Sequence, residues 1–342
     1  MRKIYVIVVF LFLFSCHKAT IYDKQTYSSF PETVKLHGQD IKLKDSVYFS
    51  VPKIFIDDTL CCIYDIAVKE GCCCHIFKFP EFKYKYSLVK VGRGKDEIIN
   101  LPSSIKFQQG YIDIVDNINK KNLRYNVLDT AAAPISIYSL KDYILDFVPL
   151  SDTSFVAIST SPQHTHRIKI YNQSGIIIDA LLPLPKLKKA IPTNFDINEV
   201  WASKLWYNAK DSLLIVATQN GEVLDFINLQ TKEHYISVGP GGKPELDYKD
   251  KTITIPGKII GFNEISADDQ YVYALFSGIS QKDFIWKNAE ENYKLQIYDK
   301  QGTPICQYTF DRPVTSCYVD MKNRKIYATD RISEWMLSVF DL

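Results

Sequence analysis

Methionine is scarce in this chain, and the periodicity of an amphipathic helix is missing from it. The 342 residues include 3 methionines against 22 tyrosines and 19 phenylalanines. No stretch beyond the N-terminus keeps apolar residues at the spacing of 3.6 that a helix needs to bury one face. The sequence therefore predicts an all-β fold.

Familiar catalytic motifs are also missing. The patterns G-x-S-x-G, H-E-x-x-H and G-x-x-x-x-G-K-[ST] do not occur. Gly92-Arg-Gly-Lys95 lacks the serine or threonine of a phosphate-binding loop, so we interpret it as a connection between structural units. We expect no catalytic residues, no metal and no cofactor.

Excess charge is absent once the N-terminal segment is set aside. Residues 1–15 carry two basic and no acidic side chains, so their removal takes the formal net charge from +2 to 0. Binding to nucleic acid relies on a basic surface. A neutral mature chain therefore disfavours nucleic acid as a partner.

The N-terminus has the features of an export signal. Arg2 and Lys3 precede an apolar run from Ile4 to Phe14, which is too short to cross a bilayer core of about 30 Å as a helix. Leu13-Phe-Ser-Cys16 resembles the lipobox of bacterial lipoproteins, in which cleavage leaves the cysteine as the lipid-modified N-terminus. The alternative is an ordinary signal peptide cut near Ser15.

We predict a signal peptide at residues 1–15, lipidation of Cys16 and a polar tether over residues 16–32. No acidic cluster follows Cys16. We therefore expect a lipoprotein on the periplasmic side of the outer membrane, held there by its N-terminal lipid.

A four-strand unit recurs through residues 33–342. Its clearest copy, Phe262 to Phe310, reads as two hairpins in sequence. Ile170-Tyr-Asn-Gln-Ser-Gly175 matches Ile297-Tyr-Asp-Lys-Gln-Gly302, each a strand that runs into a glycine turn. Six units of about 40–50 residues predict a single six-bladed β-propeller of four-stranded antiparallel blades.

The sixth unit ends after three strands. The spare segment Ser46 to Val51 is predicted to supply the fourth strand and to close the ring. Closure of this kind hides edge strands that would otherwise pair with other chains.

Two glycine-rich segments identify a family. Val91-Gly-Arg-Gly-Lys-Asp-Glu97 resembles the segment that joins successive blades in TolB-like six-bladed propeller lipoproteins of Gram-negative gut bacteria, and Val238-Gly-Pro-Gly-Gly-Lys-Pro-Glu245 resembles an expanded copy. The resemblance covers most of the mature chain. It implies the propeller fold and leaves the activity undefined.

The predicted loops sort unevenly onto the two faces of the propeller. The long ones join strands two and three, or join successive blades, and these connections share one face, which we call the long-loop face. Long loops in a compact domain are often functional. The candidate binding residues on this face are Arg93, Lys95, His164, His166, Phe284, Trp286 and Trp335.

Several of these residues have plainer interpretations. Trp286 and its neighbours could stack on a sugar or anchor a protein, or could pack on their own blade. His164 and His166 have a spacing that suits metal ligands, but without a nearby carboxylate they are more simply loop residues.

The cysteines allow three interpretations. Cys61 and Cys62 are predicted to lie on a strand next to the one that carries Cys72, Cys73 and Cys74. They could be free buried thiols, form one cross-strand disulfide or bind a metal, although the spacing fits no common zinc pattern. Cys306 and Cys317 are expected on outer and inner strands of neighbouring blades, and not to bridge.

Together these features favour a non-catalytic binding or scaffold lipoprotein of the cell envelope, with a protein or a glycan as its partner. The alternative is a hydrolase or lyase, similar to propeller lactonases, with a site assembled from several blades at the channel mouth.

Overall fold

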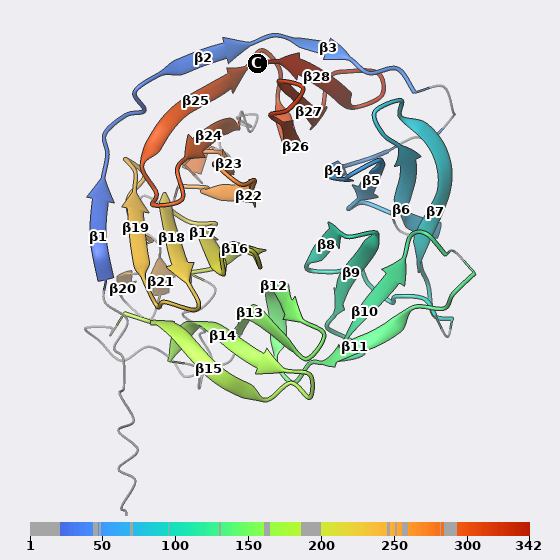
Figure 1. Cartoon of the computed structure of the whole chain (residues 1–342), viewed down its shortest axis with the longest axis horizontal. Helices are drawn as coiled ribbons and strands as arrows, with labels where there is room; N and C mark the ends of the chain where they lie inside the picture. The colour runs from blue at the N-terminus through green and yellow to red at the C-terminus, as the bar shows by residue number, and fades with distance from the viewer. Residues whose placement is uncertain are drawn as a thin grey trace, which may run out of the picture.

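The computed structural model describes residues 21–43, 47, 49–68, 71–94, 96–129, 131–160, 165–185, 200–244, 247–249, 252–254, 259–280, 282–283 and 293–342. Six four-stranded antiparallel sheets stand around a central axis as the blades of a propeller (Figure 1). The predicted fold class is confirmed. No helix among the described residues is long and apolar enough to cross a membrane.

Within each blade the strands run outward from the axis in chain order. Blades 1 to 3 contain β4 (Pro52–Asp57), β5 (Leu60–Asp65), β6 (Gly71–Lys78) and β7 (Lys83–Val91); β8 (Ile105–Gln108), β9 (Tyr111–Asp116), β10 (Lys121–Asn126) and β11 (Ile135–Ser139); and β12 (Tyr143–Ser151), β13 (Ser154–Thr160), β14 (His166–Asn172) and β15 (Ile177–Pro183).

Blades 4 to 6 follow the same order. They contain β16 (Ser203–Asn208), β17 (Leu213–Thr218), β18 (Val223–Asn228) and β19 (His234–Val238); β22 (Phe262–Ala267), β23 (Val272–Phe276), β24 (Lys294–Tyr298) and β25 (Pro304–Phe310); and β26 (Val314–Asp320), β27 (Lys325–Asp330) and β28 (Leu337–Asp341). A small hairpin, β20 (Asp247–Lys249) and β21 (Thr252–Thr254), lies in the connection between blades 4 and 5.

Hydrophobic clusters fill the interfaces between blades. Cys62 and Ile76 of blade 1 pack in one cluster with Ile112 and Ile114 of blade 2, and each of the other interfaces around the ring has a comparable cluster. Strand alternation sends one set of side chains to each neighbouring blade. Since both faces of a blade are covered, its middle strands are buried throughout, as in β5 and β17.

The N-terminal segment closes the ring from outside. β1 (Ile21–Thr26) pairs in parallel with β19, β2 (Thr33–Leu36) pairs in parallel with β25, and β3 (Gly38–Asp40) pairs antiparallel with β28. We call residues 21–40 the belt. In Figure 1 it is the blue trace along the outer edges of blades 4, 5 and 6.

The belt changes two expectations. The strand that completes blade 6 is β3, not Ser46 to Val51, of which the described residues lie outside any strand. Val47 and Phe49 instead pack against the cluster between blades 6 and 1. Residues 21–32, expected in the tether, include β1, a fifth strand of blade 4.

The longest connections begin and end on one face of the propeller. They are residues 92–104, 184–202, 239–261 and 277–293, which join strands two and three or successive blades. The turns from strand one to strand two are short and lie on the opposite face. The inner strand of each blade therefore starts at the long-loop face.

Candidate functional site

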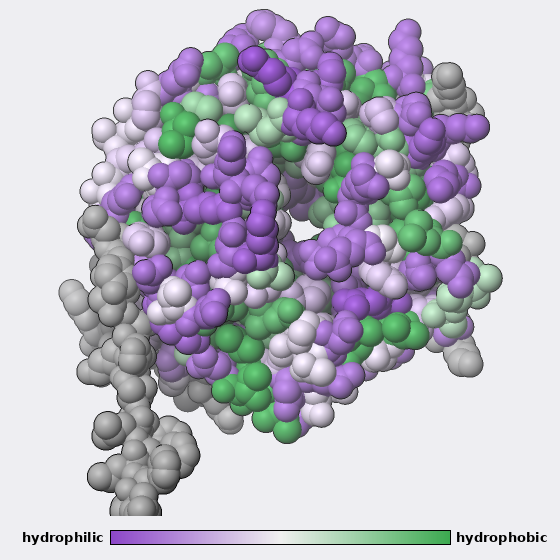
Figure 2. Space-filling model, in the orientation of Figure 1, coloured by the Kyte–Doolittle hydropathy of each residue, from purple (hydrophilic) through white to green (hydrophobic). Residues whose placement is uncertain are grey.

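The axis of the propeller is an open channel. Its cavity measures about 660 Å³ and is lined by the inner strands β4, β8, β12, β16, β22 and β26. Figure 2 shows the opening at the centre of the ring, bordered largely by hydrophilic residues. Volumes of about 300–1,000 Å³ are typical of small-molecule sites.

At one level of this channel, blades 1 to 5 each place a charged residue in the wall, and blade 6 has the buried Ser316 at the equivalent position. These residues occupy equivalent positions near the start of the inner strands, and we call them the polar ring: Lys53, Lys106, Asp146, Lys204, Glu264 and Ser316. Since inner strands start at the long-loop face, the ring lies just inside the mouth on that face.

Three ring residues accept a hydrogen bond from the next blade. Asp146 Oδ2 accepts from the Leu205 amide at 2.7 Å, and Glu264 Oε2 accepts from the Cys317 amide at 3.0 Å. The Ser316 hydroxyl accepts from the Ile54 amide, also at 3.0 Å. The acceptors thus join the inner strands of blades 3 and 4, 5 and 6, and 6 and 1.

The lysines of the ring differ in their partners. Lys106 Nζ lies 3.2 Å from Asp146 Oδ1 and donates to the Leu205 carbonyl at 3.0 Å. Lys53 Nζ lies 3.8 Å from Glu264 Oε1, which is too long for a hydrogen bond. Lys204 makes no hydrogen bond or ion pair with any residue that the structure describes. With three lysines and two carboxylates, the ring has one uncompensated positive charge.

Burial and neighbouring charge shift the pKa values of this ring. Burial raises the pKa of Asp146, but Lys106, Lys204 and the hydrogen bonds from Ser104 and Leu205 outweigh it and hold the pKa below its usual value. Burial raises the pKa of Glu264, and the charge of Lys53 does not compensate.

Two lysines of the ring have lowered pKa values, because burial disfavours the charged form of a cation. Burial lowers the pKa of Lys53 and of Lys106, against the raising effect of the nearby carboxylates. The charged form of each lysine is therefore poorly solvated, and a counter-ion that binds it would have to displace few water molecules.

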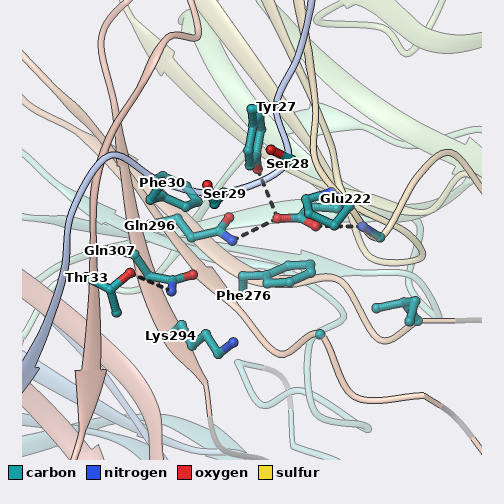
Figure 3. Close-up of a pocket in the computed structure, with 14 residues that line it drawn as sticks. Tyr27, Ser28, Ser29, Phe30, Thr33, Glu222, Phe276, Lys294, Gln296 and Gln307 are labelled. Atoms are coloured by element: carbon teal, nitrogen blue, oxygen red, sulfur yellow. Dashed lines mark hydrogen bonds between the residues drawn. The ribbon is translucent and has the colours of Figure 1, made fainter.

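A second cavity, of about 410 Å³, lies between the belt and blades 4 and 5. Figure 3 shows Tyr27 and Gln296 directed at the carboxylate of Glu222, with Lys294 further along the wall. Glu222 Oε1 accepts from the Tyr27 hydroxyl and from Gln296 Nε2, each at 2.9 Å. Burial and the charge of Glu222 raise the pKa of Tyr27, so its hydroxyl stays protonated and donates.

The glycine-rich segments are both built around a carboxylate. Gly94 donates its amide to Glu97 Oε2 at 2.7 Å, and a Cβ on Gly92 would lie 2.0 Å from that same oxygen. In the second segment a Cβ on Gly239 would lie 2.2 Å from Glu222 Cδ, and Gly241 donates its amide to Glu222 Oε2 at 2.8 Å. The glycines leave room for the acid, which in the second segment comes from the β17–β18 turn.

The model of a protein family described as "TolB-like 6-blade propeller-like" matches residues 29–322. This chain belongs to that family. The resemblance drawn from its two glycine-rich segments is therefore confirmed.

Solved structures share the fold of this TolB-like propeller at low identity. A putative exported protein from Bacteroides fragilis NCTC 9343 superposes with a TM-score of 0.61 at 14% identity, over 93% of this chain and 97% of the other. A member of a domain-of-unknown-function family from Bacteroides vulgatus ATCC 8482 has a TM-score of 0.54 at 11% identity, over 89% and 96%. No curated protein sequence matches significantly.

Three of the predicted binding residues lie in the described part of this TolB-like propeller. Arg93 is exposed between blades 1 and 2, and His166 starts β14 of blade 3 with its Nδ1 atom 2.9 Å from the Thr165 hydroxyl. Trp335, in the connection between β27 and β28, packs against the cluster between blades 6 and 1. They border the same face but belong to different blades, so they do not form one cluster. Lys95, His164, Phe284, Trp286 and Cys16 lie outside the described residues.

The seven cysteines after Cys16 are free. Cys62 lies on β5, beside the strand that carries Cys74, and the Cys73 thiol donates to the Val89 carbonyl. Among the described residues, no group of three or more His, Cys, Asp or Glu side chains is placed to hold a metal ion. As predicted, Cys306 lies on an outer strand and Cys317 on the inner strand of the next blade.

The polar ring was not found from the sequence, although a signal for it exists. When the first strands of blades 1, 2 and 4 are aligned, a lysine stands one or two residues before an aromatic residue in each: Lys53 before Phe55, Lys106 before Phe107 and Lys204 before Trp206. A charged residue that recurs on inner strands indicates a ring around the channel.

Proposed function

We propose that this TolB-like propeller is an exported binding protein of the cell envelope, held by a lipid on Cys16, which receives a protein or glycan on its long-loop face. Its N-terminal sequence supports export, and a solved neighbour of similar fold is described as a putative exported protein. Arg93, His166 and Trp335, together with Lys95, His164, Phe284 and Trp286, are the proposed contact residues.

One observation carries the preference for binding over catalysis. The carboxylates that line the channel, Asp57, Asp146 and Glu264, each accept a hydrogen bond from the backbone of the next blade, and Asp146 and Glu264 each have a lysine nearby. Asn263, which also lines the channel, donates to the Thr315 carbonyl. A lactonase-like site needs such groups to converge on a reacting centre, whereas here they are used between blades.

Site-specific photo-crosslinking in living cells tests the face. A crosslinker at Arg93 or Trp335 is expected to give a discrete adduct with an envelope protein or glycan, and one at Lys322 is the matched control. Lys322 is exposed on the turn between β26 and β27, on the opposite face. Adducts that form equally from both faces, or from Lys322 alone, would show that the partner does not bind specifically to the long-loop face.

Fractionation of cells tests the anchor. The Cys16→Ser variant is expected to leave the membrane fraction and appear in soluble extract, because the lipid can no longer be attached. If this variant stays with the membrane as the wild type does, Cys16 is not the anchor.

A further inference from the structure

The polar ring contains a cation that the blades do not use. Lys53 lies near Glu264, and Lys106 is paired with Asp146. Lys204 is half-buried in the channel wall and has no hydrogen-bond or ion-pair partner among the described residues. A partly buried charge without a partner has a substantial desolvation cost, which a bound counter-ion would offset.

The neighbouring blade supplies an unused acceptor. Glu264 Oε1 is shielded from solvent and has no hydrogen-bond partner, since Lys53 Nζ is 3.8 Å away. The charge of Lys204 acts on both Glu264 and Asp146, so the ammonium group lies within electrostatic range of both carboxylates. Since Oε1 is closed off from the channel, a ligand at Lys204 would be bound by the ammonium group and not by this carboxylate.

The rest of the wall suits a small organic molecule. Trp206 lies two residues after Lys204, on the same side of β16, and lines the channel with Phe55 and Leu101. Flat apolar surfaces beside a charged group favour a compact ligand that has both an apolar C–H face and polar edges, as sugars and sugar acids do. The ring has one positive charge in excess, so a single negative charge on the ligand would balance it.

We propose that the polar ring binds a small hydroxylated monocarboxylate, of the kind of a sugar acid. Its carboxylate pairs with Lys204, and its C–H face packs against Trp206. This inference rests on the proposed function, because the ligand enters through the mouth on the long-loop face.

Isothermal titration of the purified mature chain tests the site. The probes are sodium gluconate, sodium glucuronate and uncharged glucose, at constant ionic strength because salt screens such pairs. We expect gluconate or glucuronate to bind and glucose to bind at least tenfold more weakly. Lys204→Gln should weaken binding of the acid about tenfold or more, since a hydrogen bond to a charged group is lost.

Two further variants act as controls. Lys204→Arg keeps the charge and should bind the acid within about threefold of the wild type, which shows that a loss in Lys204→Gln is not a folding defect. Lys322→Gln removes a lysine from the opposite face and should leave the affinity unchanged.

Each remaining outcome overturns the inference. Equal affinity of the wild type and Lys204→Gln would place the acid elsewhere, and equal affinity for glucose would remove the charge requirement. No heat with either acid at 10 mM would show that the ring does not bind this class. In all three cases, adducts from Arg93 or Trp335 would still support the proposed binding face, while their absence would count against the face itself.

Discussion

Glu222 joins the belt to blades 4 and 5 by side-chain hydrogen bonds, in addition to the strand pairing, and replacing it with alanine tests what those bonds contribute. Its carboxylate accepts three hydrogen bonds, from Tyr27 of the belt, from Gln296 of blade 5 and from the Gly241 amide. The side chain itself is 4% exposed. In Glu222→Ala these donors lose their acceptor and a cavity takes its place.

The loss in the free energy of unfolding can be worked out from those contacts. The Tyr27 hydroxyl keeps a partner, since it lies 2.6 Å from the Tyr298 hydroxyl. Gln296 Nε2 and the Gly241 amide are left without one, and an unsatisfied buried donor costs about 1–3 kcal/mol. Because Gly241 is only half-buried, we expect Glu222→Ala to lower the free energy of unfolding by about 2–4 kcal/mol.

Urea denaturation followed by tryptophan fluorescence measures this loss. Glu222→Gln is the matched control, because it keeps the shape and one acceptor, and we expect about half the loss. Limited trypsin digestion gives a local readout, since Lys24 and Lys35 lie in the belt and should be cut faster in Glu222→Ala. An unfolding free energy within about 0.5 kcal/mol of the wild type, with unchanged cleavage, would refute the reasoning.

Further predictions concern the polar ring and the closing strand. The folded-state pKa of Asp146 is lowered, so its contribution to stability is present above the unfolded value of about 3.9 and is lost as pH falls through the folded value; Asp146→Asn should therefore cost about 1–3 kcal/mol at pH 7 and progressively less as the pH falls below about 4. The folded-state pKa of Glu264 is raised, so its proton stabilises the fold at low pH and this contribution is lost as pH rises; Glu264→Gln should be at least as stable as the wild type at pH 7. Urea midpoints measured from about pH 2 to 7 test both signs, and the opposite order of the variants in either pH range would contradict the corresponding one. In the closing strand, a Cβ at Gly38 would lie 2.7 Å from the Phe340 ring, so Gly38→Val should lower the free energy of unfolding by about 1–3 kcal/mol in the same assay, while Gln39→Val, at an exposed position beside it, should cost less than about 0.5 kcal/mol.

The blades could be predicted from the sequence because their strands carry local signals. Tyr111 to Val115 is rich in aromatic and β-branched residues and follows a glycine turn, and the structure has β9 at Tyr111–Asp116. The closing strand could not be predicted in this way. Gly38–Asp40 is short and polar and lies on the outside of blade 6, where it pairs with β28 and is also held by the side chains of Asp311 and Arg312, so no apolar pattern marks it. The apolar residues Val47 and Phe49 serve packing and not pairing.

The parallel strands of the belt were missed for a similar reason. Ile21–Thr26 and Thr33–Leu36 add to sheets that are already complete, and exposed positions dominate their described side chains. An outer fifth strand needs few apolar side chains, because little lies beyond it to pack against; in β2, Leu36 and Val34 pack into the cluster between blades 5 and 6. The composition of such a segment looks like that of a tether.

The candidate site depends on residues that are far apart in the sequence. The polar ring combines side chains from Lys53 to Ser316, and the lack of a partner at Lys204 emerges only when Lys106 and Asp146 are seen to pair across blades. Likewise, the acid held by Gly239 and Gly241 is Glu222, from a neighbouring turn. The glycines of a sequence motif indicate that space is left for a neighbouring side chain, but they do not show which acidic residue occupies it.

The belt also determines how a pull on the N-terminus would be carried. Any tension applied ahead of Ile21 reaches the protein first through β1 and its parallel bonds to β19, then through β2 and β25, and then through β3 and β28. The three ladders are loaded one after another, so they would release in sequence and lengthen the chain while the inner strands still surround the channel. In a propeller tethered by this end, the belt would therefore act as an extensible linker that is stored on the outside of the domain.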